Sequence, residues 1–316
     1  MSPRIKPSAP AATVRQRWRL LLRPRVWFAL TLLGGIGYGA HYAWQHVAPS
    51  IARHPQYALT AERIHITPPP PWIRTDIKSE VLRDAGLDDS LSILDSDIVT
   101  LRIHNAFQFH PWVESVARIT KHLPSALEVE IQYRRPIAAV ESTDPGGVTY
   151  LPIDVHGIRL PEADLTDAEC RYLPRISGVT GRPLVGDSWN DTRVLGGAKL
   201  IAALADVWER LQLVEVLCAA QATPNDDRPN CVFEIVTSGG TRIVWGTAPG
   251  QEASAGESAF DQKRQRLVEY AAQHGRLDSI KGPERLDVRR ELIVTPRTAR
   301  KRPSESPNAA TQSTTR

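Results

Sequence analysis

Residues 113–133 read VESVARITKHLPSALEVEIQY, and this stretch decides how the middle of the chain folds. From Leu127 to Tyr133 apolar and polar side chains alternate strictly, which predicts a strand with one buried face. The apolar residues between Val113 and Ile119 predict an earlier strand, and Leu123-Pro124-Ser125 supplies the turn between the two. The stretch therefore predicts two consecutive strands joined by a short turn.

Three further elements are predicted before this pair of strands. Residues 63–66 alternate like a strand. A helical pattern begins at Thr75 and stops at Gly86. A second helix begins at Asp95 and ends before Pro111, because the residue before a proline avoids the helical region. The predicted order is therefore β-α-α-β-β.

Short strands predominate after residue 136. We expect a mainly antiparallel β domain with flanking helices over 137–296, so the predicted fold class is α+β. The predicted helices are Gly196–Leu211 and Ala259–His274, and Gly275 stops the second. The predicted strands are Ile137–Ser142, Val148–Pro152, Ile158–Pro161, Leu213–Ala220, Cys231–Val236, Thr241–Trp245 and Leu286–Val294.

The run from Val26 to Trp44, VWFALTLLGGIGYGAHYAW, contains no charged residue. A helix of this length spans roughly 28 Å, close to the ~30 Å hydrocarbon core, so the run predicts a single N-terminal transmembrane helix over 26–45. Seven basic residues precede the run and the first acidic residue is Glu62, which predicts a cytoplasmic N-terminus. The alternatives are a cleaved signal peptide and a buried soluble helix.

Gly35 and Gly39 lie within this run at the G-x-x-x-G spacing. This spacing allows a second helix to approach closely, so the two glycines are candidates for self-association. The alternative is that glycine is simply common in membrane helices.

The composition of the 316 residues excludes several classes of protein. A hydrophobic share of 41% and a charged share of 23% exclude wholesale disorder, collagen and coiled coil. The pI near 9.0 comes from the basic N-terminal residues. The rest of the chain is slightly acidic and has no basic-aromatic stripe, which argues against nucleic-acid binding. Three cysteines are too few for a disulfide-stapled scaffold.

The sequence contains no G-x-S-x-G, H-E-x-x-H or P-loop motif. His104 and His110 are six positions apart, a spacing that does not place both on one helical face, which argues against a metal site there. We therefore expect no catalysis, no cofactor and no metal. Cys218 and Cys231 flank a predicted hairpin loop, and they form either a disulfide or two separate buried thiols.

A series of short motifs carries a family resemblance. The motifs are Pro111-Trp112-Val113, Leu123-Pro124-Ser125, Arg135-Pro136-Ile137-Ala138, Ile153-Asp154-x-x-Gly157, Leu173-Pro174-Arg175-Ile176-Ser177-Gly178 and Leu286-Asp287-Val288-Arg289. Their order and spacing resemble the bacterial cell-division family FtsQ, called DivIB in other bacteria. The prolines that follow Thr67, and Arg134 in place of the usual glutamate, depart from the family pattern.

The resemblance implies an order of domains and a function. The expected segments are a cytoplasmic basic tail (1–25), the transmembrane helix (26–45), a linker (46–58), a POTRA-like domain (59–136), an FtsQ-type β domain (137–296) and a disordered tail (297–316). The implied protein is a non-enzymatic scaffold at the cytoplasmic (inner) membrane, with its folded domains in the periplasm or otherwise outside the cytoplasm. It would bind division proteins resembling FtsB and FtsL and help control septum formation and septal peptidoglycan synthesis.

Two other functional classes stay open. One is another POTRA-bearing envelope protein, of outer-membrane assembly or secretion. The other is a membrane-anchored exported enzyme.

The predicted last strand, Leu286–Val294, is the candidate partner-binding edge. A final strand before a disordered tail offers unpaired backbone groups, which invite strand addition by another chain. The FtsQ resemblance points to the same strand, and the candidate contact residues are Arg289, Arg290, Leu292 and Ile293. The alternative is that the two arginines are solvated charges that protect the edge.

Overall fold

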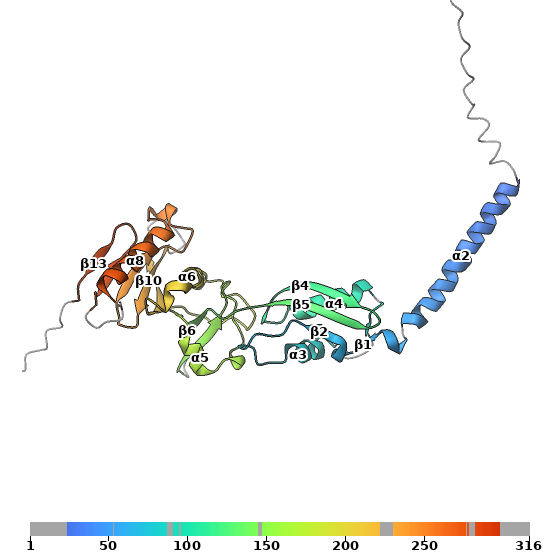
Figure 1. Ribbon diagram of the computed structural model, residues 1–316, viewed down its shortest axis with the longest axis horizontal. Coiled ribbons are helices and arrows are strands. Elements are labelled where there is room, and N and C mark those ends of the chain that lie inside the picture. Colours follow the sequence, from blue (N-terminus) through green and yellow to red (C-terminus); the bar gives the residue numbers. More distant parts are fainter. Residues whose placement is uncertain are drawn as a thin grey trace, which may run out of the picture. The chain divides into compact units, whose positions relative to one another are not determined.

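The computed structural model describes residues 24–52, 54–86, 91–94, 96–144, 147–221, 230–275, 277 and 282–297. The chain divides into two compact units (Figure 1). The first combines Met1–His65, Leu82–Ile103 and Ile119–Val129, and the second combines Ile66–Val81, His104–Arg118 and Glu130–Arg316. Most of the predicted tails, 1–23 and 298–316, and the predicted helix start at Asp95 lie outside the described residues. The proposed domain boundary at residue 136 stays a prediction.

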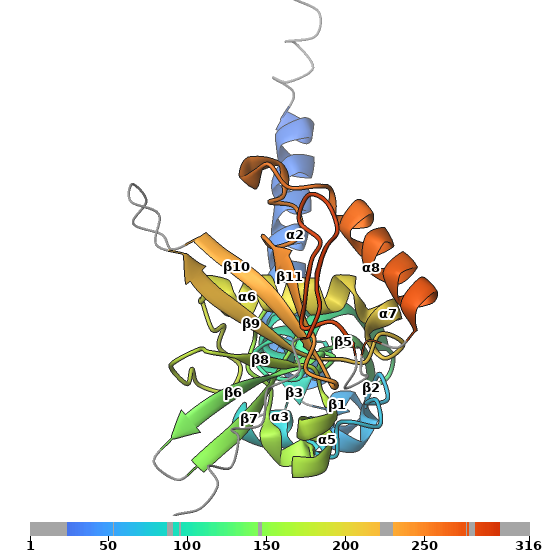
Figure 2. The ribbon, with the colours of Figure 1, turned by 90° about the vertical axis from the view of Figure 1, so that its left-hand side faces the viewer.

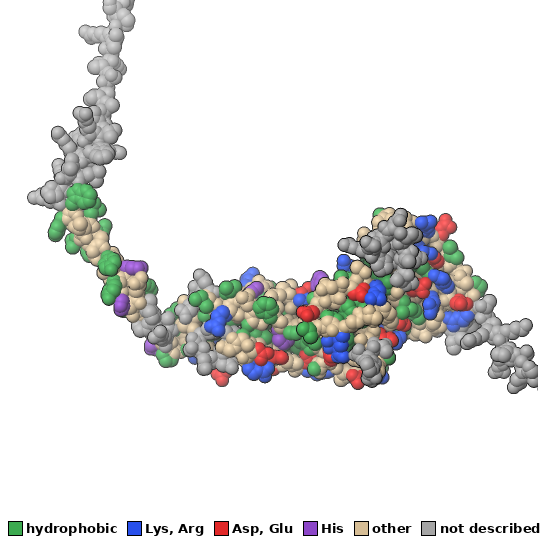
Figure 3. Space-filling model, turned by 180° about the vertical axis from the view of Figure 1, so that it is seen from behind, with side chains coloured by type: hydrophobic (Ala, Val, Ile, Leu, Met, Phe, Trp, Pro, Cys, Tyr) green, Lys and Arg blue, Asp and Glu red, His purple; other side chains and the backbone are tan. Residues whose placement is uncertain are grey.

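The prediction of a transmembrane helix over 26–45 is wrong. A single helix, α2 (Pro24–Ala52), contains the apolar run. No helix in the described part of the chain is long and apolar enough to cross a membrane. The run is diluted by four glycines and by the polar side chains of Thr31 and His41. The large hydrophobic side chains of α2, among them Phe28 and Leu33, are exposed (Figure 3).

The pairing role expected of Gly35 and Gly39 stays a prediction. A Cβ built on either glycine would have no neighbouring atom within 4 Å.

Strands β2 (Ile64–Ile66), β5 (Ala126–Tyr133) and β4 (Val113–His122) form a three-stranded sheet in that order. In β5 the buried and exposed side chains alternate, as the sequence pattern predicts. Helices α3 (Ile77–Asp84) and α4 (Ser96–Gln108) come between β2 and β4 in the chain. The apolar residues Val99, Ile103 and Phe107 recur every fourth position along α4, and all three are buried.

Short elements complete this part of the chain. Strand β1 (Ala58–Leu59) pairs antiparallel with β3 (Leu91–Ser92). The 3-10 helices η1 (Pro55–Tyr57) and η2 (Ala61–Arg63) flank β1.

An eight-stranded sheet lies in the second unit (Figure 2). Its strand order is β13-β12-β11-β10-β9-β8-β6-β7. The strands are β6 (Ala138–Asp144), β7 (Gly147–Ile153), β8 (Arg175–Ser177), β9 (Leu213–Gln221), β10 (Asn230–Thr237), β11 (Arg242–Gly246), β12 (Arg285–Asp287) and β13 (Ile293–Thr295).

The sheet of the predicted β domain is mixed, because four of its seven strand pairs are antiparallel and three are parallel. The pairs β6–β8, β8–β9 and β11–β12 are parallel. A parallel pair needs a crossover connection, which usually contains a helix. Here the three crossovers contain α5 (Asp167–Tyr172), then α6 (Thr192–Ala203) with α7 (Ala205–Trp208), and then α8 (Phe260–His274). The 3-10 helices η3 (Glu162–Asp164) and η4 (Ala253–Ala255) lie in the loops.

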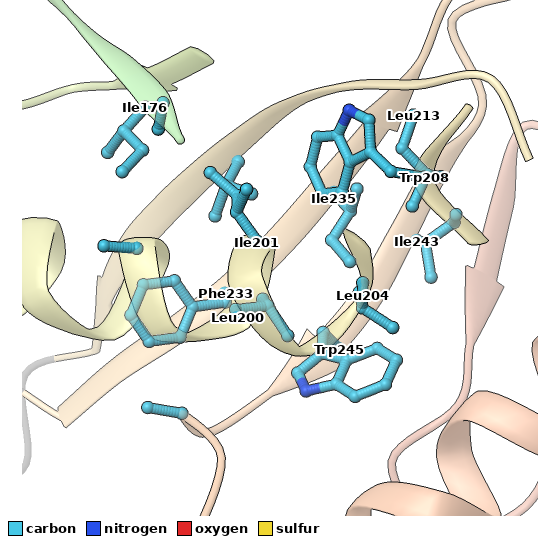
Figure 4. Close-up of a cluster of buried hydrophobic side chains, with 14 of the residues drawn as sticks. Ile176, Leu200, Ile201, Leu204, Trp208, Leu213, Phe233, Ile235, Ile243 and Trp245 are labelled. Carbon is cyan, nitrogen blue, oxygen red and sulfur yellow. The ribbon is translucent and has the colours of Figure 1, made fainter. Parts of the chain in front are cut away.

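The core lies on one face of this sheet, beneath α6, α7 and α8 (Figure 4). Helix α6 packs so closely that a Cβ on Gly196 would overlap the Phe233 ring. The strand registers place one apolar residue from each strand in a row across the sheet. In order, the row is Leu151, Val140, Ile176, Val216, Ile235, Ile243, Leu286 and Val294. The first seven are buried, and Val294, on the last strand, is 41% exposed.

A buried carboxylate, Asp164 of η3, ties together segments that are far apart in sequence. It accepts hydrogen bonds from the Thr75 backbone N–H and hydroxyl at 2.7 Å each, and from the Trp112 indole N–H at 2.5 Å. Burial alone would raise the pKa of Asp164. The hydrogen bonds from Thr75 and Trp112 outweigh burial, so its pKa is lower than usual. Asp164 is therefore an ionised acceptor at neutral pH.

Candidate partner-binding edge

The predicted single strand Leu286–Val294 is two strands in the structure. Strand β12 ends at Asp287, and β13 begins at Ile293 and runs antiparallel to it. The change of direction begins at Asp287, whose carboxylate accepts a hydrogen bond from the Arg289 backbone N–H at 3.1 Å. A carboxylate that binds the backbone two residues later stabilises a turn rather than a continuing strand. Arg289 and Arg290 therefore lie in the turn 288–292.

Strand β13 is the last strand at one end of the eight-stranded sheet. Its three residues are uncharged and exposed, and Ile293 is 61% exposed. Within the described residues, no strand pairs with the side of β13 that faces away from β12. Such an edge presents backbone donors and acceptors to which an incoming strand can bond.

A pocket of about 300 Å³ lies beside β13. Its lining residues come from the loop 255–257, from β12 and β13, and from the turn between these strands. They are Ala255, Glu257, Asp287, Arg289, Arg290, Glu291 and Ile293. A partner that adds to β13 therefore meets charged side chains next to the apolar Ile293.

Ser258 holds the two walls of this pocket together. Its backbone N–H donates to the Arg289 carbonyl at 2.7 Å, and its hydroxyl donates to the Arg290 carbonyl at 3.0 Å. The Arg266 guanidinium donates to the Ser258 hydroxyl at 2.9 Å and to the Val288 carbonyl at 3.1 Å. The turn 288–292 is therefore fixed by bonds from the preceding loop and from α8.

The two arginines of the turn differ in their availability. Arg289 makes a bidentate ion pair with Asp287, in which one terminal N–H donates to Oδ2 at 2.7 Å and Nε–H donates to Oδ1 at 3.1 Å. The bonds with Asp287 raise the pKa of Arg289 more than burial lowers it. Burial alone would raise the pKa of Asp287, but the hydrogen bonds from Arg289 keep it below its usual value. Arg290 is exposed, and among the described residues its side chain bonds only to the Gly256 carbonyl, at 3.1 Å. Arg290 is therefore the cation better placed to meet an acidic partner.

A buried ion pair lies behind the pocket. The Lys263 ammonium of α8 lies 2.6 Å from the Glu257 carboxylate, and Lys263 is fully buried. Glu257 also accepts hydrogen bonds from the Thr247 backbone N–H and hydroxyl, both at 3.0 Å. Gly246 has a φ of 100°, and a Cβ there would overlap the Glu257 carboxylate. These contacts fix the loop 255–257 against α8 and β11.

The structure brings together three of the four residues predicted for partner binding. Arg289, Arg290 and Ile293 line the pocket, whereas Leu292 is half-buried and packs against the core. Glu257 could not be predicted from the sequence, because its loop lies about 30 positions before the turn and carries no motif. The described lining residues include three carboxylates and two guanidinium groups, and no Ser, Thr, Cys or His.

Cys218 of β9 and Cys231 of β10 are joined in a disulfide, with their Cα atoms 5.6 Å apart. Strands β9 and β10 pair antiparallel, and the bridge lies near the ends of these strands that border residues 222–229. Cys170 is a free, buried cysteine in α5.

Removing this bridge is expected to lower the free energy of unfolding. A cross-link that closes a loop of this size contributes up to about 3 kcal/mol by restricting the unfolded chain. The double variant Cys218→Ser/Cys231→Ser should therefore melt at a lower temperature than the wild type in differential scanning calorimetry. A reductant should lower the melting temperature of the wild type and leave that of the double variant unchanged. Equal sensitivity of both proteins to the reductant would contradict this role of the bridge.

Comparisons with models of protein families and with curated proteins gave no match for this chain.

Proposed function

We propose that the protein is a non-enzymatic scaffold of the bacterial cell-division machinery, of the FtsQ type. The observation that carries the proposal is β13, an exposed and uncharged edge strand beside a pocket lined by charged side chains. In this role β13 accepts a strand from a division protein resembling FtsB or FtsL. The scaffold thereby helps control septum formation and septal peptidoglycan synthesis.

Two sequence motifs behind the FtsQ resemblance have local structural roles, which supports the proposal. In Ile153-Asp154-x-x-Gly157, the Asp154 carboxylate accepts hydrogen bonds from the His156 and Ile158 backbone N–H groups at 2.9 Å, and Gly157 has a φ of 68°. In Leu286-Asp287-Val288-Arg289, the carboxylate and the guanidinium form the ion pair that shapes the turn. A turn of a given geometry requires particular residues, so the same motif indicates the same turn. The same turns at the same places in the chain favour a shared fold.

The disulfide supports a location outside the cytoplasm. Disulfides form and persist in oxidising compartments such as the bacterial periplasm. The bond between Cys218 and Cys231 is therefore consistent with folded units that act at the envelope.

Proline substitutions in β13 test the proposal. The backbone N–H groups of neighbouring strand residues point to opposite edges, so one of the Ile293 and Val294 amides faces β12 and the other faces away. Proline removes the amide hydrogen. We expect proline at the outward position to abolish capture of the FtsB-like protein while the melting temperature stays near that of the wild type. Capture is measured by affinity purification after detergent solubilisation.

The matched controls are Ile293→Ala and Val294→Ala, which keep the amide and lose the side chain. They should still capture the partner, though less strongly. If Ile293→Pro and Val294→Pro both capture the partner as well as the wild type does, binding does not use the backbone of β13.

A further inference from the structure

We propose that the opposite edge of the sheet, strand β7, binds the β7 strand of a second copy of this chain. The two strands would run antiparallel about a two-fold axis at Thr149. Strand β7 lies at the other end of the sheet from β13, so this pairing leaves both copies of β13 free. The inference does not depend on the proposed division function.

The backbone of β7 is open on one side. Its seven residues pair with β6 in an unbroken register from Ala138↔Ile153 to Asp144↔Gly147. On the other side, the Pro152 carbonyl accepts a hydrogen bond from the Leu160 N–H at 2.9 Å. No backbone hydrogen bond to another described residue covers the outer side of Gly147–Leu151. This five-residue segment is therefore available for strand addition.

The segment itself carries none of the sequence features that usually protect an edge. Protected edges carry charged side chains, prolines or bulges. Gly147–Leu151 contains no charge and no proline, and its pairing with β6 contains no bulge. Val148 is 53% exposed although it is apolar.

The sequence of β7 is complementary to itself. When two copies pair antiparallel about Thr149, each Val148 lies opposite the Tyr150 of the partner, and the two Thr149 residues lie opposite each other. Pairs of an aromatic with a β-branched residue, and pairs of threonines, are favourable cross-strand pairs. No charge on either strand opposes the approach of the same segment. These pairings favour a second copy over an unrelated strand.

A strand pair of this length buries a small surface, so we expect a reversible dimer rather than an obligate one. A two-fold contact of this kind is closed, because the same patch is used on both copies. The expected assembly therefore stops at two chains.

Cysteine cross-linking tests the register. Residues directly opposite each other have Cβ atoms about 4.5–5.5 Å apart, within reach of oxidative cross-linking. In the full chain, kept in a non-ionic detergent, Thr149→Cys should cross-link to itself. Val148→Cys alone and Tyr150→Cys alone should cross-link poorly, whereas a mixture of the two should cross-link efficiently. The wild type shows the background from the native cysteines.

Sedimentation measures the dimer itself. We expect Val148→Lys to shift the wild-type dimer to a monomer, because the two-fold axis brings the added charges near each other in the interface. The matched substitution at the other edge, Ile293→Lys, should leave the dimer intact. Both positions are exposed, so both variants should keep the wild-type melting temperature. A monomeric wild type, a dimer that survives Val148→Lys, or equal cross-linking at 148 and 149 would each overturn the proposal. A longer polymer that Ile293→Lys dissolves would also overturn it in favour of head-to-tail pairing of β7 with β13.

Discussion

Replacing Trp112 by Ala is expected to lower the free energy of unfolding by about 3–5 kcal/mol, the usual cost of removing a buried aromatic side chain. Trp112 is fully buried, and its indole N–H donates to Asp164 at 2.5 Å. The substitution removes the packing and also takes one donor from an ionised, buried carboxylate. Urea unfolding of the full chain, followed by circular dichroism, measures the change.

Two further variants separate these causes. Trp112→Phe keeps most of the packing and removes the indole donor, which should cost about 1–3 kcal/mol. Asp164→Asn keeps the shape of the side chain and removes the charge, and its unfolding should depend less on pH below the ordinary pKa of 3.8. In the wild type, the stabilisation from ionised Asp164 is present above that pKa. It is lost as the pH falls through the lower pKa of the folded state. An unfolding curve of Trp112→Ala that matches the wild type would show that Trp112 is not part of the packing.

Replacing Lys263 by Met is expected to cost a similar amount, about 3–5 kcal/mol, because it leaves a buried carboxylate without its cation. Lys263 is fully buried, and its ammonium contacts Glu257 at 2.6 Å and lies 5.5 Å from the centre of the Trp245 ring. Met has a similar length and no charge, so the packing against Trp245 is largely kept. The same urea unfolding measures the loss.

The double variant Lys263→Met/Glu257→Gln is the matched control. Removing both charges of a buried pair is often nearly neutral, and the Gln oxygen can still accept the hydrogen bond from the Thr247 N–H. We therefore expect the double variant to be clearly more stable than Lys263→Met alone. If the two variants are equally unstable, the loss comes from packing and not from the uncompensated charge of Glu257.

The periodic elements could be predicted from the sequence. The alternation over Leu127–Tyr133 predicted the burial pattern of β5. The apolar face of the segment before Gly275 predicted α8, whose helix ends at this glycine with a φ of 85°. Such patterns depend on residues that are neighbours in the chain, so a single sequence contains them.

The arrangement of those elements was harder to predict. The helices between β8 and β9 and between β11 and β12 were expected. The parallel pairing of the strands that these helices connect was not expected. The sequence predicted one continuous last strand because apolar residues recur along it, from Leu286 and Val288 to Leu292 and Ile293. The ion pair of Asp287 with Arg289 ends β12, and such a pair leaves no periodic signal in the sequence. The prediction of a membrane span was wrong because it relied on the lack of charge in the run from Val26 to Trp44. The helix that contains this run is not apolar enough to cross a membrane.

The site itself depends on contacts between distant residues. Glu257 lines the pocket because Lys263 and Thr247 hold it there, and Ser258 bonds to the turn 288–292. Thr247, Glu257 and Ser258 belong to none of the motifs that carry the family resemblance. The sequence could therefore indicate the edge residues Arg289, Arg290 and Ile293, but not the pocket around them.

Photo-cross-linking in living cells is the most direct test of the claim that β13 binds a division protein. A photo-reactive amino acid is placed at Ile293 or Thr295, and at Tyr172 as a control that is more exposed than Ile293, since Tyr172 is 90% exposed and Ile293 is 61% exposed. We predict adducts with a division protein at the two β13 positions and none at Tyr172, with the cross-linked protein identified by mass spectrometry. Adducts only at Tyr172, no adduct at either β13 position, or adducts with a protein unrelated to division would contradict the account.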